Sequence, residues 1–248
     1  MKILKLGQML GGSNTAVSGF SNKYAIDFDG VDDHIEVADA VALRLNASDA
    51  SWSFWVKLDS LSGGDGKMIA KGQTAGAGNQ SYQIRTDNAD LKFQFYYPTV
   101  GWRTVTGSSY FTSLDWVHVV VTMQQSTKNV TIYKNGSVFQ SGTSIGYPIP
   151  SNTGELMFGC RANLTNFLSG MLDEVGIFNT VLSAGTVTSI YNSGTPASLE
   201  DVSGLVGWWR MGDPNGTAAY PTIIDQSTNS NNGTMTNMVS GDIVTTVP

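Results

Sequence analysis

The chain has 248 residues, of which 41% are apolar and 14% are charged, so it can bury a sizeable core and is not disordered by composition. Its formal net charge is −6 and its 14 basic residues are scattered, which argues against a nucleic-acid partner because such surfaces need clustered Lys and Arg. Cys160 is the only cysteine, which excludes an intrachain disulfide and a cysteine-based metal site.

Residues 1–22 form an arm rich in Gly and Ser. Lys5 and Gln8 interrupt its apolar run, so the run is too short for the hydrophobic part of a secretory signal peptide. No apolar run in the sequence approaches the length of a membrane-spanning helix. We therefore expect a protein that does not use the ordinary secretory route and has no membrane partner.

The middle of the chain predicts one strand after another. Residues 51–58 (SWSFWVKL) and 91–97 (LKFQFYY) alternate in the manner of half-buried strands. Residues 116–123 (WVHVVVTM) are apolar on both sides, which is typical of a central strand covered on both faces. Asn135 and Gly136 lie between two alternating runs and predict a type I′ hairpin, because both turn positions need a positive φ.

One short helix is predicted after these strands. Ser183 can cap it, Val187, Ile190 and Tyr191 follow helical spacing, and Gly194 can end it. Many short strands with one small helix predict an all-β fold, namely a two-sheet antiparallel sandwich or jelly roll.

Six segments in succession carry a family resemblance. Together they resemble a laminin-G-like domain of the concanavalin A-like lectin/glucanase jelly-roll superfamily, and the resemblance places that domain at residues 23–199. The segments are YAIDFDGVDDHIEV (24–37), SWSFWVKL (51–58), KMIAKG (67–72), WVHVVVTM (116–123), VTIYKNGSVFQSG (130–142) and GMLDEVGIFNTVLSAGTVTSIYNSG (170–194).

The segment LVGWWRMGD follows this domain, whereas in many relatives a similar segment precedes the strand that resembles YAIDFDG. The chain therefore resembles a circular permutant in which residues 200–248 complete the jelly roll and residues 205–211 form its first strand. A truncated second domain is the alternative, and docking into a neighbouring chain also remains open. Alternation along this strand places Trp209 in the core with Leu205, and Trp208 on the opposite face.

Catalysis is not expected. Glucan hydrolases of the superfamily carry a Glu-x-Asp-x-Glu strand, which this sequence lacks. The neighbouring acids Asp173 and Glu174 should point to opposite faces of a strand. A Gly-x-Ser-x-Gly nucleophile turn is absent as well, and His118, inside a predicted strand, is expected to pack structurally. We therefore predict a protein that is not an enzyme.

The resemblance implies a structural Ca²⁺ held by Asp29, Gly30 and Asp173, since many relatives bind calcium at the corresponding turn and strand. Ca²⁺ takes oxygen ligands of this kind. The alternative is that Asp29 and Asp33 accept hydrogen bonds from the amides of the turn.

One aromatic cluster falls within the sequence FYYPTVGWR. Here Tyr96, Tyr97, Trp102 and Arg103 could form a platform for sugar rings, and ordinary loop packing is the alternative.

Residues 4–33 resemble the N-termini of bacteriophage structural proteins that carry a laminin-G-like domain after a short arm. The leading prediction is a non-enzymatic virion protein, either a capsid decoration or a fibre-associated protein. Its expected partners are other virion proteins of the capsid or tail, further copies of itself, and host-surface glycans. The alternative is a carbohydrate-binding or adhesion module at a bacterial cell surface. The sequence does not identify the glycan, the particle location or the oligomeric state.

Overall fold

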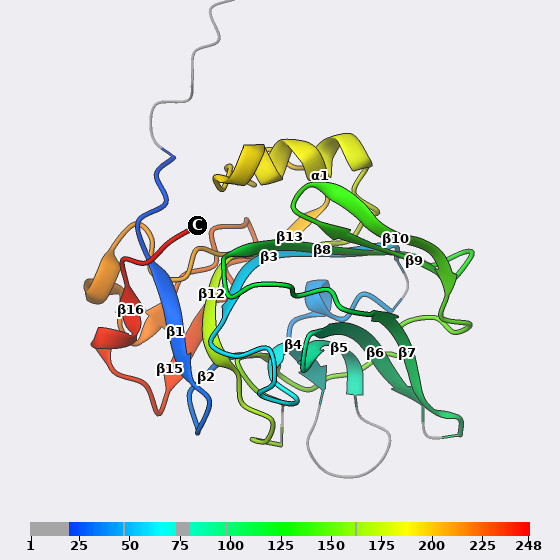
Figure 1. The fold of residues 1–248 in the computed structure, drawn as a ribbon, viewed down its shortest axis with the longest axis horizontal. Helices are drawn as coiled ribbons and strands as arrows, with labels where there is room; N and C mark the ends of the chain where they lie inside the picture. Colours follow the sequence, from blue (N-terminus) through cyan, green and yellow to red (C-terminus); the bar gives the residue numbers. More distant parts are fainter. Residues whose placement is uncertain (1–19, 47, 73–79, 98, 162) are drawn as a thin grey trace, which may run out of the picture.

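The computed structural model describes residues 20–46, 48–72, 80–97, 99–161 and 163–248, which form two antiparallel sheets packed face to face (Figure 1). The order of strands in sheet A is β10 (Ser137–Ser144), β9 (Asn129–Lys134), β8 (Val117–Gln124), β3 (Ala50–Leu58), β12 (Ser169–Phe178), β1 (Ala25–Asp29) and β16 (Ile243–Val244), and β13 (Leu205–Trp209) also pairs with β12. The order in sheet B is β14 (Thr222–Ile223), β15 (Gly233–Thr236), β2 (His34–Val37), β11 (Leu156–Phe158), β4 (Lys67–Gly72), β5 (Gln80–Asp87), β6 (Asp90–Tyr97) and β7 (Gly101–Gly107).

Helical structure is scarce. The α-helix α1 (Ala184–Tyr191) lies over the outer face of sheet A (Figure 1). Four short 3-10 helices complete the described part of the chain, namely η1 (Val41–Leu43), η2 (Asn192–Gly194), η3 (Gly216–Ala219) and η4 (Ser240–Asp242). The predicted fold class, an all-β two-sheet antiparallel sandwich with one short helix, is confirmed.

The core between the sheets is built from the alternating positions of the predicted strands. Trp52 of β3 is fully buried, and its ring centroid lies 4.9 Å from those of Tyr82 and Phe93 in sheet B. On the opposite face of sheet A, Val120 of β8 packs in a second cluster with Val187 and Ile190 of α1. The helix therefore explains why β8 is apolar on both faces, as predicted.

Local signals for the hairpin and the helix are also confirmed. Asn135 and Gly136 have φ of 50° and 77° at the turn between β9 and β10. Ser183 caps α1, because its Oγ accepts a hydrogen bond from the Thr186 amide at 3.1 Å. The helix ends at Asn192, which takes the left-handed conformation with φ of 46°, two residues before the predicted Gly194.

Strand β13, the first strand of residues 200–248, pairs with β12 on the same side as β1. Residues 169–172 of β12 pair with β1, and residues 175–178 pair with β13, so β1 and β13 lie end to end. The rest of this segment supplies β14 and β15 to sheet B and β16 to sheet A. The circular permutation and the division into residues 1–22, 23–199 and 200–248 remain predictions, and residues 1–19 lie outside the described part of the chain.

Trp209 enters the sandwich core, as the alternation predicts. It is fully buried, and its ring centroid lies 5.0 Å from that of Phe158. Trp208 lies in the second cluster on the outer side of sheet A and is 4% exposed. The expectation that Leu205 shares the core with Trp209 is wrong: Val206 does so, because a β-bulge shifts the register between Gly207 and Leu205.

Gly207 is required by the Trp209 side chain. A Cβ atom at this position would lie 2.3 Å from the Trp209 ring, closer than real Cβ contacts allow. The ring therefore folds back over the backbone of its own strand, and only glycine leaves room for it.

We expect Trp209→Ala to lower the free energy of unfolding by about 3–5 kcal/mol, because the change empties a large aromatic site in the core. Gly207→Ala should also destabilise the protein, since the new methyl group displaces the same ring. Urea denaturation of both variants measures this, with Leu114→Ala at an exposed apolar position as the control. Stabilities equal to that of the wild type would show that β13 does not contribute to the core.

Candidate functional site

The outer face of sheet B is polar along β5, β6 and β7. Ile84, Phe93 and Val105 point into the core, so the alternate positions of these strands face outward. Cross-strand pairing aligns the outward side chains in rows: Gln83 with Gln94, Gln94 with Thr104, and Tyr96 with Trp102.

The four residues of the predicted aromatic platform are divided between two faces. Tyr96 and Trp102 are a cross-strand pair on the outer face, and their ring centroids lie 5.3 Å apart in an edge-to-face arrangement. Tyr97 and Arg103 point to the other face, where both contact the ring of Tyr147, at 5.1 and 4.9 Å from its centroid. A single platform of all four residues is therefore a wrong prediction, because successive residues of a strand alternate between faces.

A small hollow adjoins Trp102 on this outer face. Its volume is about 140 Å³, and we call it the basic hollow. It is lined by Asp65, Lys67, Gln83, Arg85, Gln94, Trp102 and Arg161.

Hydrogen bonds and ion pairs fix most of these side chains. The Gln94 Oε1 accepts hydrogen bonds from Gln83 Nε2 at 2.8 Å and from Arg85 Nε at 2.7 Å. Asp65 forms ion pairs with Lys67 and, at 3.2 Å, with Arg85. Burial lowers the pKa of Lys67 to about 8, although Asp65 acts in the opposite direction.

Arg161 is the lining residue that sequence reasoning missed. It follows β11 in the chain and reaches Trp102 of β7, where its guanidinium carbon lies 5.5 Å from the ring centroid. No local pattern in the sequence predicts this contact, because the contact depends on the order of strands in sheet B.

The predicted calcium ligands are not brought together. Asp29 is opposite Ser169 in the β1–β12 ladder, whereas Asp173 lies four residues further along β12, about 13 Å away at ~3.3 Å per residue. Gly30 adopts φ of 76° at the end of β1. A site formed jointly by Asp29, Gly30 and Asp173 is therefore a wrong prediction.

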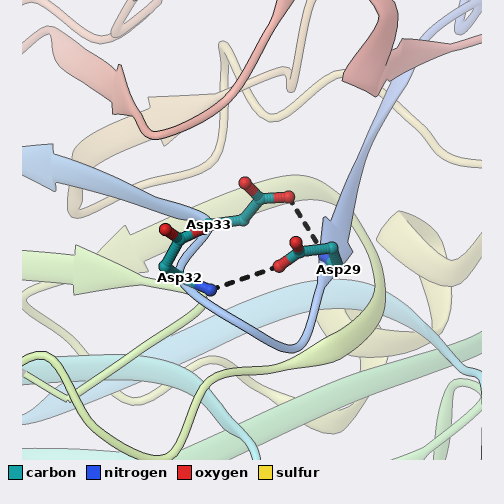
Figure 2. A group of neighbouring side chains, drawn as sticks. All are labelled: Asp29, Asp32 and Asp33. Carbon is teal, nitrogen blue, oxygen red and sulfur yellow. Dashed lines mark hydrogen bonds between the residues drawn. The ribbon is translucent and has the colours of Figure 1, made fainter.

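Asp29 is instead close to Asp32 and Asp33, with carboxylate oxygens within 4.8 Å of one another (Figure 2). Asp29 Oδ1 accepts hydrogen bonds from the amides of Val31 at 2.7 Å and Asp32 at 3.3 Å. Asp33 Oδ2 accepts one from the Asp29 amide at 3.0 Å. These oxygens are of the type that Ca²⁺ prefers, and the bonds are also those of the turn-capping alternative, so calcium remains a prediction.

Asp173 belongs to a buried polar network. Its carboxylate accepts hydrogen bonds from Asn22 Nδ2 and from the Glu174 amide, both at 2.8 Å. Glu174 accepts hydrogen bonds from Trp208 Nε1 at 2.6 Å and from Arg210 Nε at 3.0 Å. Glu174 has φ of 48° at a β-bulge, which explains why the two acids share one network instead of facing opposite sides.

Burial controls the protonation of this network. Loss of solvent, together with the neighbouring Glu174 carboxyl, raises the pKa of Asp173 well above its ordinary value. Burial also raises the pKa of Glu174 to about 7, against the opposing effect of Arg210. Neither carboxyl group is accessible, since Asp173 and Glu174 are 0% and 3% exposed.

His118 lies inside sheet A, and its Nε2 forms a hydrogen bond with Ser53 Oγ at 2.9 Å. Its ring also lies against those of Trp55 and Tyr191. Burial lowers the pKa of His118 to about 3, so the imidazole is neutral near pH 7. These contacts agree with the predicted packing role.

We expect the melting temperature to fall as the pH rises from about 6.5 to 8. In the unfolded chain, carboxyl groups release their protons near pH 4, whereas burial raises the pKa of native Glu174 to about 7 and the pKa of native Asp173 well above its ordinary value. The native state thus binds more protons in this range, and its stability falls as the pH rises. His118 has the opposite effect only below its unfolded pKa of about 6.5.

Asp173→Asn should reduce the fall of the melting temperature with rising pH. Asp115→Asn, a control at an exposed position, should leave that fall unchanged. Thermal unfolding of the three proteins at several pH values measures it. An unchanged slope in Asp173→Asn would contradict the assignment of the shifted proton to this network.

Comparison with known proteins gives one curated relative and a set of solved structures. The chain is 21% identical over 148 residues to Adhesion G-protein coupled receptor V1 of Danio rerio, which covers 57% of this chain and 2% of the receptor. This chain thus corresponds to a small part of that relative's length. In the described residues, no helix has both the length and the apolar character needed to cross a membrane.

Two examples illustrate the solved structures that share the fold. One is a Bacteroides ovatus protein whose description proposes carbohydrate binding, with a TM-score of 0.65, 18% identity, and coverage of 88% of this chain and 59% of that one. The other is the CBM40 of the Ruminococcus gnavus IT-sialidase bound to α2,3-sialyllactose, with a TM-score of 0.54, 12% identity, and coverage of 68% and 97%.

The family itself is shown by sequence. The Laminin_G_3 model, described as the concanavalin A-like lectin/glucanases superfamily, matches residues 29–188, which include most strands of both sheets. The chain therefore belongs to the laminin-G-like branch of the concanavalin A-like lectin/glucanase superfamily.

Proposed function

We propose that this protein is a non-catalytic carbohydrate-binding module and that its ligand lies on the outer face of sheet B. The observation that carries the proposal is the Tyr96–Trp102 pair, which is half-buried and adjoins the basic hollow. Sugar sites combine an aromatic ring surface with a few fixed polar groups, and this face supplies both. On the outer face of sheet A, α1 and the second cluster cover the area where a comparable aromatic and polar surface could lie.

Two structures with the same fold support the proposal that the ligand is a carbohydrate. The Bacteroides ovatus protein and the CBM40 share the fold with this chain, and the descriptions of both refer to carbohydrate binding or to a bound sugar. Since fold alone does not determine function, the argument depends on the site.

The absence of catalysis is part of the proposal. A glycosidase needs two carboxyl groups that flank the bond to be cleaved. Beside the basic hollow, Asp65 is paired with Lys67 and Arg85, and Asp87 is paired with Lys92. The Asp173–Glu174 pair is buried away from this face.

The proposal corresponds to the alternative drawn from the sequence, a carbohydrate-binding or adhesion module of a bacterial cell surface. The virion role was predicted from the N-terminal segment, and the descriptions of the two solved structures refer to carbohydrate binding or a bound sugar. The virion role, its virion partners and the homo-oligomer remain predictions.

We expect Trp102→Ala to weaken binding of the best ligand in a glycan-array screen by about tenfold or more, because the variant removes the ring surface. Unfolding free energy should change by less than about 1 kcal/mol, since Trp102 is partly exposed. Isothermal titration and thermal unfolding measure the two effects.

Tyr97→Ala is the matched control, because Tyr97 lies on β6, the strand that pairs with the strand of Trp102, and its side chain points to the opposite face of the sheet. It should retain glycan binding. A Trp102→Ala protein that binds as tightly as the wild type, or a wild type that binds no glycan, would refute the proposal.

A further inference from the structure

The basic hollow concentrates positive charge in an acidic protein. Three cationic side chains line it, those of Lys67, Arg85 and Arg161, and Asp65 is the one lining carboxylate. Asp87 approaches Arg85 to 3.7 Å but is also paired with Lys92. The hollow thus has an excess of two positive charges in a chain whose formal net charge is −6.

Two polar groups of the hollow have no hydrogen-bond partner among the described residues. Gln83 is 4% exposed, and its Oε1 accepts no hydrogen bond although its Nε2 donates to Gln94. The Nε of Arg161 is likewise buried and unpaired. Buried polar groups are nearly always paired in native structures, so a ligand bound in the hollow can satisfy both the unpaired acceptor and the unpaired donor.

We infer that the basic hollow binds the carboxylate of an acidic sugar residue, so that the glycan ligand of this protein is anionic. This inference depends on the proposed function and specifies its ligand class. The guanidinium of Arg161 has the planar donor geometry that matches a carboxylate, and its position over Trp102 limits its freedom.

The rest of the hollow fits the remainder of such a sugar. Gln83 Oε1 needs a donor, which a ring hydroxyl provides and a bare anion does not. Trp102 lines the same hollow and adds an aromatic surface to it. The volume of about 140 Å³ is below the ~300–1,000 Å³ of pockets for drug-sized ligands, so the hollow suits one sugar residue of a longer glycan.

The ligand test uses pairs of probes in which only one member carries carboxylate groups. Trigalacturonate is compared with its methyl ester, and sialyllactose with lactose, by isothermal titration against the whole chain. At least one acidic probe should bind about tenfold or more tightly than its neutral counterpart. The two pairs also distinguish a uronic acid from a sialic acid as the source of the carboxylate. Added salt should weaken the acidic member selectively.

The residue test uses Arg161→Gln, which removes the positive charge and the fork of donors. Affinity for the acidic probe should fall by about tenfold or more, and affinity for its neutral counterpart should change little. Arg103→Gln makes the same charge change on the opposite face of β7 and should leave both affinities unchanged. If Arg161→Gln does not fold, the comparison of probe pairs on the wild type still decides.

The outcomes separate this inference from the proposed function. Equal affinity for acidic and neutral probes, both lost in Trp102→Ala, would overturn the inference and leave glycan binding intact. Tighter binding of a sulfated glycan than of the carboxylated one would also overturn it. Failure to bind any glycan would refute both.

Discussion

The pairing of β12 with two separate strands on one side is the constraint on which the sandwich depends. β1 pairs with one half of that side of β12 and β13 pairs with the other half. A strand from residues 200–248 thus completes the edge of sheet A next to β1, a strand from the start of the domain. At the junction, the bulge at Glu174 turns two carboxyl groups into a buried network with Arg210. Trp209 packs in the core on one side of sheet A, and Trp208 packs in the second cluster on the other side.

This arrangement also determines which surface is left for a ligand. Helix α1 lies over the outer face of sheet A (Figure 1), and the second cluster around Trp208 packs beneath it. The outer face of sheet B along β5 to β7 instead presents polar rows that end in Tyr96 and Trp102. The basic hollow lies on this same outer face of sheet B, and cationic side chains gather in it although the chain as a whole is acidic. Both features belong to one face, and the proposed glycan site follows from their coincidence.

Periodicity in the sequence was enough for the fold class, the hairpin at Asn135–Gly136 and the burial of Trp209, because these depend on local alternation and turn chemistry. The site was only half predictable. Tyr96, Tyr97, Trp102 and Arg103 are close in sequence, but alternation on β6 and β7 divides them between two faces. Arg161 enters the site through the order of strands. The predicted calcium ligands are separated because Asp29 of β1 pairs with Ser169, four residues from Asp173 on β12. Such relations require the register of the sheet.

If the ligand binds at the outer face of sheet B, the indole N–H signals of the six tryptophans should report it in NMR spectra. Titration of ¹⁵N-labelled protein with an oligosaccharide from the glycan screen should shift the Trp102 signal and leave those of the fully buried Trp52 and Trp209 in place. Shifts at other tryptophans with an unmoved Trp102 signal would place the ligand elsewhere and contradict the account.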